Sequence, residues 1–380
     1  MTPQEKVKII KSFAEEILTE EELLHLFETK EHPVAYDGFE PSGIAPIHFG
    51  LMRALYVKKL QEAGVHMILF LADFHGMINN KLGGDLEKIK TAGKYFIEVW
   101  KAAGINVDEV EIVWASDLLT SKTYMERFLR VSKELTLDRV TKTLTIAGRS
   151  EKDKLIFAQF LYPAMQVSDI FELDLDMVEM GMDQRRANVI AREVAHKLHC
   201  KVPVAVHHHM LLGLKGTKDG DNPEEVMVKS KMSKSDPTSA IYMHDSRAEI
   251  MDKIKGAFCP AKQTSGNPVL EYARYITIPS LGSLKVERKT EHGGNIEYKL
   301  YSDLEADFTN GALHPLDLKA AVARDLDVLI KPVREHFETD PVAKKLYEEV
   351  KSYQITRWSD LGPGSGPGMT GCFYGYISQA

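Results

Sequence analysis

Short apolar runs alternate with amphipathic segments through the first two-thirds of the chain, and this alternation most constrains its fold. The apolar runs have the length and composition of buried strands, and the segments between them have helical spacing. The expected strands are 33–39, 65–75, 110–116, 175–181 and 202–209. The expected helices are 48–63, 85–104 and one that begins near residue 183. Such alternation predicts an α/β fold with a doubly wound parallel sheet and helices on both faces.

Two changes in this pattern divide the chain. Residues from about 120 to 171 are helix-rich and predict a helical insertion in the sheet domain, which we expect to span 1–240 with N-terminal helices. Residues 241–357 are helix-rich with one expected strand pair, LKVERK and IEYKLY, and predict a second domain. Residues 358–380 are rich in glycine and proline and predict a flexible tail. A length of 380 residues fits two domains.

Composition limits the class of protein. The net charge of −7 gives no global sign of nucleic-acid binding, so contact with a polyanion would depend on local basic patches. No run approaches the ~20 apolar residues that span a bilayer, and the N-terminus lacks the apolar core of a signal peptide. The 3 cysteines have no metal-like spacing and suit a reducing compartment. We therefore expect a cytoplasmic protein without membrane attachment.

The turn after the first expected strand carries phosphate-binding chemistry. No G-x-x-x-x-G-K-[ST] sequence is present, and the glycines at 362–368 follow no strand, so two common phosphate motifs are excluded. Instead, Gly38 is followed by Pro-Ile-His-Phe-Gly (46–50), which begins a helix. The free N–H groups of a helix start and the side chain of His48 suit phosphate oxygens. The alternative is a plain turn with an N-terminal histidine.

A second candidate for phosphate binding is the basic stretch KSKMSKSDP (229–237). Lys231 and Lys234 flank Ser233, and mobile cations with hydroxyl donors suit a polyphosphate whose charge rearranges during reaction. The alternative is a solvated loop. The pairing of H-x-G after the first strand with K-M-S-K-S after the last strand favours the first interpretation, because together they are the two signatures of class I aminoacyl-tRNA synthetases.

From about residue 20 to 355 the chain resembles the tyrosyl-tRNA synthetases of the archaeal and eukaryotic cytosolic kind. The matching segments are YDGFEPSG (36–43), HFG (48–50), LADFH (71–75), YPAMQVSDI (162–170), GMDQ (181–184), KMSKS (231–235) and HPLDLK (314–319). The resemblance implies a Rossmann-like core, ATP-dependent formation of tyrosyl-adenylate, and transfer of tyrosine to the 3′ end of tRNA(Tyr). It also implies a homodimer, for which we expect the inserted helices at about 120–160 to form the interface.

Polar residues at helical spacing predict the amino-acid pocket. Tyr162, Gln166 and Asp169 fall at i, i+4 and i+7 of one helix face, and Pro163 is expected as the first helical residue. Their surroundings are apolar, so these groups either satisfy one another or meet a ligand. The resemblance implies that Tyr162, Gln166 and Gln184 hold the ammonium and carboxylate of tyrosine.

The resemblance also implies how the side chain of tyrosine is recognised. Tyr36 and Asp169 would bond the phenolic hydroxyl, and Ala72 and His75 would line the pocket. His75 is alternatively a core histidine.

The resemblance further implies contacts with ATP, which enters with Mg²⁺ and without a dedicated protein metal site. His48 would serve the α- and β-phosphates, and Lys231 and Lys234 would close over the β- and γ-phosphates as catalytic groups. Leu51 stands where the family often has a second histidine. His48 would therefore be the histidine of this turn that contacts the phosphates. Asp183 would bind the ribose, or alternatively cap a helix. The ATP-contacting residues implied are Gly38, Gly50, Gly181, Asp183, Ser233 and Lys234.

Further histidines lie in the expected C-terminal domain and in the last expected strand of the sheet. By resemblance, His292, His314 and Asp317 would contact the anticodon from the C-terminal domain, while helix capping is the alternative for the last two. His207–His209 lie adjacent on a strand and would point to alternate faces, so they make a poor shared metal site. We expect one or two of them to face the adenine of ATP.

Three other functions are compatible with part of these features. A tryptophanyl-tRNA synthetase shares both signatures, but Tyr36 with Asp169 argues for tyrosine. A small-molecule nucleotidyltransferase would lack the long C-terminal part. A non-catalytic, synthetase-like RNA-binding protein would be expected to lose some of the two signature lysines and His48, and all three are present.

Overall fold

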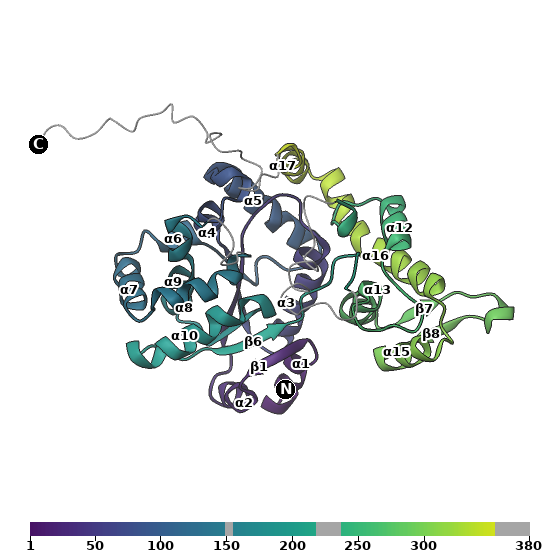
Figure 1. Cartoon of the computed structure of the whole chain (residues 1–380), viewed down its shortest axis with the longest axis horizontal. Helices are drawn as coiled ribbons and strands as arrows, with labels where there is room; N and C mark the ends of the chain where they lie inside the picture. Colours follow the sequence, from purple (N-terminus) through teal and green to yellow (C-terminus); the bar gives the residue numbers. More distant parts are fainter. Residues whose placement is uncertain (149–154, 218–236, 354–380) are drawn as a thin grey trace, which may run out of the picture.

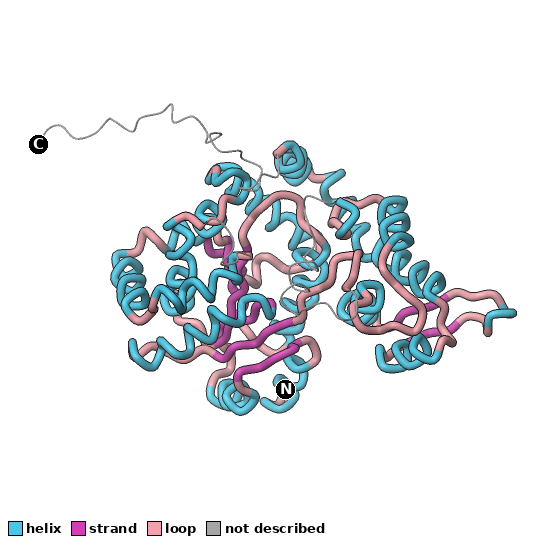
Figure 2. The backbone as a smooth tube through the Cα atoms, viewed as in Figure 1, coloured by secondary structure: helices cyan, strands magenta, loops and turns pink. Residues whose placement is uncertain are grey.

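A six-stranded sheet forms the centre of the N-terminal part (Figures 1 and 2). The computed structural model describes residues 1–148, 155–217 and 237–353. The strands are β1 (Ala14–Leu18), β2 (Val34–Phe39), β3 (His66–Leu71), β4 (Glu111–Trp114), β5 (Met177–Gly181) and β6 (Val204–His208). Their order is β1-β6-β5-β2-β3-β4, and every pair is parallel except β1 with β6. The predicted doubly wound fold is confirmed.

Two details of the predicted sheet are wrong. The strand expected over 65–75 ends at Leu71, and Asp73–Ile78 form helix α4. A continuous apolar run does not separate a buried strand from the buried helix that follows it. The N-terminal segment also contains β1, which we expected to be helical. Its two charged residues, Glu15 and Glu16, interrupt the apolar run that would indicate a strand. Its pairing with β6 is a long-range contact, which local spacing does not reveal.

Helices cover both faces of this sheet (Figure 2). The α-helices of the N-terminal part are α1 (Pro3–Lys11), α2 (Glu20–Thr29), α3 (Arg53–Glu62), α4, α5 (Leu86–Ala102), α6 (Ala115–Leu118), α7 (Lys122–Lys133), α8 (Leu137–Thr143), α9 (Phe157–Glu172) and α10 (Arg185–Leu198). The short turns are η1 (His48–Met52, π-helical) and the 3₁₀ turns η2 (Lys81–Gly84), η3 (Leu144–Ala147) and η4 (Met182–Gln184). The expected helix 48–63 therefore consists of η1 and α3, and Gly64 follows with a φ of 82°.

Helix α9 begins earlier than its proline indicates. We expected Pro163 to open this helix, but the helix starts at Phe157 and Pro163 lies inside it. A proline inside a helix removes one backbone hydrogen bond. The cost is tolerated here because this stretch of α9 is buried almost throughout. Packing against the sheet therefore outweighs the local preference of proline for a helix start.

The C-terminal part is mostly helical, as predicted. Its elements are η5 (Pro237–Ser239), α12 (Arg247–Gly256), α13 (Pro268–Tyr272), η6 (Ala273–Thr277, π-helical), α14 (Ile278–Leu281), β7 (Leu284–Val286), η7 (Thr290–His292), β8 (Ile296–Tyr298), α15 (Tyr301–Asn310), α16 (Pro315–Thr339) and α17 (Pro341–Ser352). The expected strand pair is confirmed as the antiparallel hairpin β7–β8. The domain boundary near residue 240 stays a prediction, and the expected tail 358–380 lies outside the described residues.

One hydrophobic core joins the two parts. A continuous cluster of buried side chains runs from Ile10 through α3 and α5 to Val350 in α17. Figure 1 shows α17 and α16 beside α5, and His336 Nε2 lies 2.7 Å from the Glu98 carboxylate across this contact. The C-terminal helices therefore rest directly on the helix layer that flanks the sheet. No helix in the described ranges has the length and apolar character to cross a membrane.

Candidate active site

The site lies where the order of the sheet reverses. From β2 the chain adds β3 and β4 on one side, while β5 and β6 lie on the other. In sheets of this kind ligands bind at the carboxyl ends of the strands beside such a reversal. Tyr36 and Gly38 belong to β2, Ala72 directly follows β3, and Gly181 ends β5. The topology therefore places these four predicted residues at or near one edge of the sheet.

Asp169 is the centre of a buried polar cluster. It is 1% exposed, and its Oδ1 accepts a hydrogen bond of 2.5 Å from the hydroxyl of Tyr124. His75 Nε2 lies 3.1 Å from Oδ2 of the same carboxylate. Burial lowers the pKa of His75, but the negative charge of Asp169 outweighs it, and the net pKa is above the ordinary value. Tyr124 was missed at the sequence level because it lies in an amphipathic helix and in no motif.

The hydroxyl of Tyr36 faces this cluster from β2. The side chain is 1% exposed, and its hydroxyl makes no hydrogen bond of good geometry with a described residue, although Gln166 lies close enough to interact. Burial, and after it the charge of Asp169, raises the pKa of Tyr36, so the phenol stays protonated and able to donate. A donor and a charged acceptor therefore border the same space, as recognition of a hydroxyl group requires.

The polar groups one and two turns along α9 form a second cluster. Gln166 Nε2 donates to Gln184 Oε1 at 3.2 Å, while Gln166 Oε1 is buried without a partner among the described residues. The ring of Tyr162 packs edge-on against His75 at 4.9 Å. Burial and the Glu40 carboxylate raise the pKa of the Tyr162 hydroxyl. Acceptors such as Gln166 Oε1 and Glu40 suit a bound ammonium group, and Glu40 was not predicted although it lies within YDGFEPSG.

The turn at His48 is π-helical and tightly packed. Trp100 Nε1 donates to the carbonyl of Phe49 at 2.8 Å. A Cβ on Gly50 would lie 2.3 Å from Met243 Sδ, so glycine is needed here for close packing, whatever it contributes to a ligand. The buried Leu51 occupies the place of the family's second histidine. The residues predicted to complete this region, Lys231, Ser233 and Lys234, lie outside the described residues.

The end of β5 is equally close-packed. A Cβ on Gly181 would lie 2.3 Å from Met210 Sδ and 2.8 Å from Asp183 Oδ1. Asp183 lies in the 3₁₀ turn η4, and the alternative that it caps a helix is wrong: the N-caps are Gly181 for η4 and Gln184 for α10. The role of Asp183 in binding a ribose stays a prediction.

A buried ion network, also unpredicted, underlies this edge of the sheet. Arg53 of α3 is 2% exposed and pairs with Asp37 of β2 at 2.6 Å and with Glu179 of β5. His208 Nδ1 of β6 lies 2.5 Å from Glu179. Burial raises the pKa of Asp37, and for Glu179 the charges of Arg53 and His208 overcome burial and lower the pKa. One guanidinium therefore joins two strands directly beneath the residues that line the site.

Known proteins are similar to this chain in sequence and in fold. A family model described as tRNA synthetases class I (W and Y) matches residues 28–331. Tyrosine–tRNA ligase 1, cytoplasmic, of Arabidopsis thaliana is 44% identical over 357 residues, which cover 93% of this chain and 90% of that protein. The tyrosine–tRNA ligase of Thermococcus gammatolerans is 43% identical over 378 residues, covering 94% of this chain and 100% of that protein.

Among solved structures, the tyrosyl-tRNA synthetase of Pyrococcus horikoshii, complexed with L-tyrosine, matches with a TM-score of 0.84 and 40% identity. The match covers 92% of this chain and 100% of that chain. The chain belongs to the tyrosyl-tRNA synthetases. Its function is therefore the activation of tyrosine with ATP and the charging of tRNA, and the tryptophanyl, nucleotidyltransferase and non-catalytic alternatives are set aside.

The three adjacent histidines of this tyrosyl-tRNA synthetase each meet a carboxylate. His207 Nδ1 lies 2.9 Å from Glu16, and His209 lies 3.0 Å from Glu15 and 3.1 Å from Glu271. Within the described ranges, no three His, Cys, Asp or Glu side chains are grouped as metal ligands. The expectation that one or two of these histidines face adenine stays a prediction.

His209 makes stability depend on pH. Burial opposes its charge, but Glu15 and Glu271 raise its pKa to about 9. A group whose pKa rises on folding stabilises below its unfolded pKa, near 6.5, and loses this contribution as pH rises through the folded value. We expect the loss of unfolding free energy in His209→Gln to be about 3 kcal/mol larger at pH 6 than at pH 9.5, because the loss of stacking on Tyr275 is common to both pH values.

Urea unfolding at both pH values measures this difference. His25→Gln is the matched control, because His25 is 76% exposed and should leave the pH dependence intact. Equal losses at pH 6 and pH 9.5 in His209→Gln would show that the histidine is not protonated in the fold.

The residues predicted to read the anticodon lie in the C-terminal part of the synthetase. His292 is exposed and lies in η7, the turn between β7 and β8. This hairpin lies at the right of Figure 1. His314 is the N-cap of α16, where its Nδ1 accepts from the Leu316 amide at 3.2 Å, so the capping alternative holds for His314. Asp317 lies in the first turn of that helix and is not its cap.

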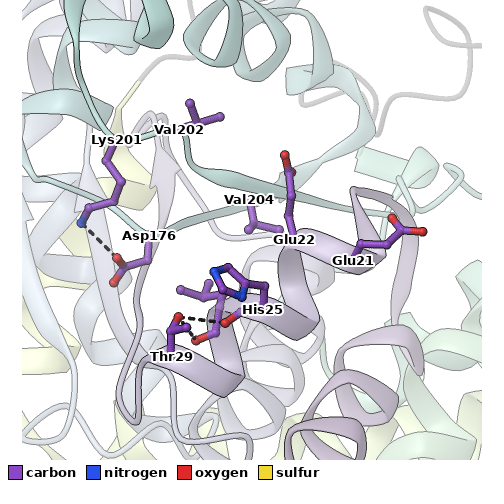
Figure 3. A pocket seen from close by; sticks show the side chains of 9 residues that line it. Glu21, Glu22, His25, Thr29, Asp176, Lys201, Val202 and Val204 are labelled. Atoms are coloured by element: carbon purple, nitrogen blue, oxygen red, sulfur yellow. Dashed lines mark hydrogen bonds and ion pairs between the residues drawn. The ribbon is translucent and has the colours of Figure 1, made fainter.

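A pocket of about 360 Å³ lies at the opposite edge of the sheet (Figure 3). Its lining residues include Glu22 and His25 of α2 and Val204, which begins β6. Lys201 and Asp176 also line it and form an ion pair at 2.9 Å. Because it adjoins the amino ends of β5 and β6, it is separate from the site at their carboxyl ends.

Proposed function

We propose that Asp169 and Tyr36 recognise the phenolic hydroxyl of tyrosine. The observation that carries this proposal is the buried carboxylate of Asp169 facing the buried hydroxyl of Tyr36. In this arrangement the substrate hydroxyl donates to Asp169 and accepts from Tyr36. Tyr124 and His75 hold the carboxylate from the side, and Ala72 adjoins the same pocket.

The other end of the pocket fits the charged groups of the amino acid. Gln166 Oε1 and the carboxylate of Glu40 accept hydrogen bonds from the ammonium, with Tyr162 beside them. Gln184 is held by its own donation to the Ile146 carbonyl at 2.9 Å, which orients the amide toward Gln166. This directs the substrate carboxylate toward the His48 turn and the ATP phosphates.

The chemistry is an in-line displacement. The tyrosine carboxylate attacks the α-phosphorus of ATP, which enters as its magnesium complex, and pyrophosphate leaves. A hydroxyl at the 3′ end of tRNA(Tyr) then attacks the activated carbonyl and releases AMP. Catalysis depends on position and on stabilising phosphate charge, and no side chain is covalently modified. His48 and the amides of η1 serve the α- and β-phosphates, and Lys231 and Lys234 serve the β- and γ-phosphates.

Exposed apolar side chains on the inserted helices indicate where a second copy of the chain binds. Met125, Leu129, Leu137 and Phe157 are large apolar side chains that remain exposed on α7, α8 and α9. Such a group of exposed apolar residues suits burial against a second copy of the chain. We therefore assign the homodimer interface to this face.

We assign the anticodon contacts to His292 and Asp317 of the C-terminal part. We also assign the protein to the cytoplasm.

Replacement of His48 by alanine is expected to reduce kcat of tyrosine-dependent pyrophosphate exchange about 100-fold, with KM for tyrosine within about two-fold, because one donor to the transition state is lost. The KM is preserved because His48 lies outside the amino-acid pocket. An equal loss in kcat and tyrosine affinity would contradict this division of roles.

Pyrophosphate exchange without tRNA, tested with each of the twenty amino acids, checks the assignment of the pocket. Exchange with tyrosine alone supports the roles proposed for Tyr36 and Asp169. Equal exchange with phenylalanine would show that neither residue reads the hydroxyl.

A further inference from the structure

Two segments far apart in the sequence hold each other beside the His48 turn. The Ile47 amide donates to the Ile241 carbonyl at 2.9 Å, and the Met243 amide donates to the Ala45 carbonyl at 3.0 Å. Pro46 and Tyr242 form an antiparallel bridge between these bonds. The residues directly before His48 are therefore fixed by the segment that leads into α12.

A chain of buried and partly buried hydrogen bonds crosses this contact. The Ala45 amide donates to the hydroxyl oxygen of Tyr95 at 3.2 Å, and this oxygen lies 2.9 Å from His244 Nε2. Burial, with a further contribution from Lys351, lowers the pKa of His244 to about 3. The imidazole is therefore neutral at ordinary pH, and in the tautomer that carries its hydrogen on Nδ1, Nε2 accepts a hydrogen bond from the Tyr95 hydroxyl. The direction of donation then runs from Ala45 through Tyr95 to His244.

His244 is itself positioned by the C-terminal helices. Its ring stacks on Tyr347 of α17 with centroids 3.8 Å apart and planes inclined by 17°. It also meets Phe337 of α16 edge-on at 4.7 Å. The same Phe337 lies 5.5 Å from the ring of Tyr95. The position of the imidazole therefore depends on α16 and α17 being docked on α5.

Helix α5 supports the His48 turn at two further points. Trp100 donates to the Phe49 carbonyl, and the ring of Phe96 lies 5.2 Å from that of Phe49. Tyr95, Phe96 and Trp100 thus hold the turn from one helix. Of these contacts, the bond that Tyr95 accepts from Ala45 is the one that continues to the C-terminal helices.

We propose that Tyr95 and His244 are positioning residues for tyrosine activation, which fix residues 45–47 and thereby set the place of His48 against ATP. This inference rests on the role proposed above for His48. Neither side chain need touch a substrate. The hydroxyl of one and the imidazole of the other make the geometry of the turn depend on the docked C-terminal helices, so an anticodon-binding part that is out of place would slow the chemistry at the sheet.

Pyrophosphate exchange with purified, full-length variants tests the proposal. Tyr95→Phe keeps the ring and removes the hydroxyl, and we expect kcat to fall about ten- to hundred-fold while KM for tyrosine stays within about two-fold, because small misplacements of reacting groups cost this much. Tyr298→Phe is the matched control. Its hydroxyl donates to Asp307 at 2.9 Å within the C-terminal part, and its loss should leave kcat unchanged.

Two substitutions of His244 separate positioning from simple packing. His244→Phe keeps an aromatic ring against Tyr347 but offers no acceptor, and His244→Gln offers an acceptor near the place of Nε2 but no ring. We expect kcat to be low in His244→Phe and substantially restored in His244→Gln, whatever the unfolding midpoints of the two. If Tyr95→Phe does not fold, this pair decides the question alone.

The outcomes are distinguishable from a failure of the proposed function. If His48→Ala lowers kcat while Tyr95→Phe and His244→Phe match the wild type, the positioning proposal is overturned and the role of His48 stands. If kcat instead follows only the unfolding midpoint across the variants, the bonds are structural and the proposal is also overturned. If His48→Ala has wild-type kcat, the role of His48 itself is wrong and the positioning proposal falls with it.

Discussion

Replacement of Asp169 by asparagine is expected to reduce kcat/KM for tyrosine about 10- to 100-fold, because a hydrogen bond to a charged group contributes about 1.5–3 kcal/mol. Activity toward phenylalanine should change little, since that substrate has no hydroxyl to offer the carboxylate. The asparagine Oδ1 still accepts from Tyr124, while the amide nitrogen takes the place of Oδ2 beside His75. Selection of tyrosine over phenylalanine by enzymes of this family is a standard illustration of the effect, and only its assignment to Asp169 is specific to this chain.

Competition between the two amino acids in pyrophosphate exchange measures this ratio. Asp303→Asn, an equivalent change at an exposed position of α15, is the control and should leave discrimination intact. Tyr36→Phe should reduce the ratio less than Asp169→Asn, because it removes a bond between neutral groups. An unchanged ratio in both pocket variants would refute the recognition of the hydroxyl at this end of the pocket.

Replacement of Arg53 by methionine is expected to lower the unfolding free energy by about 3–5 kcal/mol, the usual cost of removing one partner from a buried ion pair. Methionine fills much of the volume but leaves Asp37 and Glu179 without their shared positive charge. Because those carboxylates lie in β2 and β5, the strands on either side of the reversal in the sheet are affected together.

Denaturant unfolding at neutral pH measures the loss. Arg130→Met is the matched control: Arg130 pairs with Glu126 at 2.6 Å, but both side chains are about two-thirds exposed, and the expected change is within about 0.5 kcal/mol. Similar losses of unfolding free energy in the two variants would mean that the buried network stabilises the fold no more than an exposed ion pair does.

The parts of the site that the sequence predicted are those whose spacing or motif is local. Tyr162, Gln166 and Asp169 share a face of one helix by spacing alone, and the structure places all three on α9. Tyr124 and Arg53 escaped prediction because their importance comes from partners far along the chain. The partner of Tyr124 is 45 residues away, and Arg53 reaches a carboxylate at a separation of 126.

The same distinction applies to the fold. Strands β2 to β6 are short apolar runs whose environment can be inferred from their own residues. Strand β1, AEEIL, is defined by its neighbour, because pairing with β6 turns a charged and apparently helical segment into an edge strand. Pro163 is also defined by its surroundings. Proline prefers the first position of a helix, but burial of the residues around it extends α9 back to Phe157.

The edge strand β1 also has a consequence for synthesis of the protein. Ala14 pairs with His208 and Leu18 with Ala205, so this segment leaves the ribosome nearly two hundred residues before its partner. Pairing over such a separation is slow, and the nascent chain must keep this segment unpaired while the rest of the sheet is made. Glu15 and Glu16 reduce the risk of aggregation during this interval, because charged residues on an unpaired edge strand discourage its pairing with another chain.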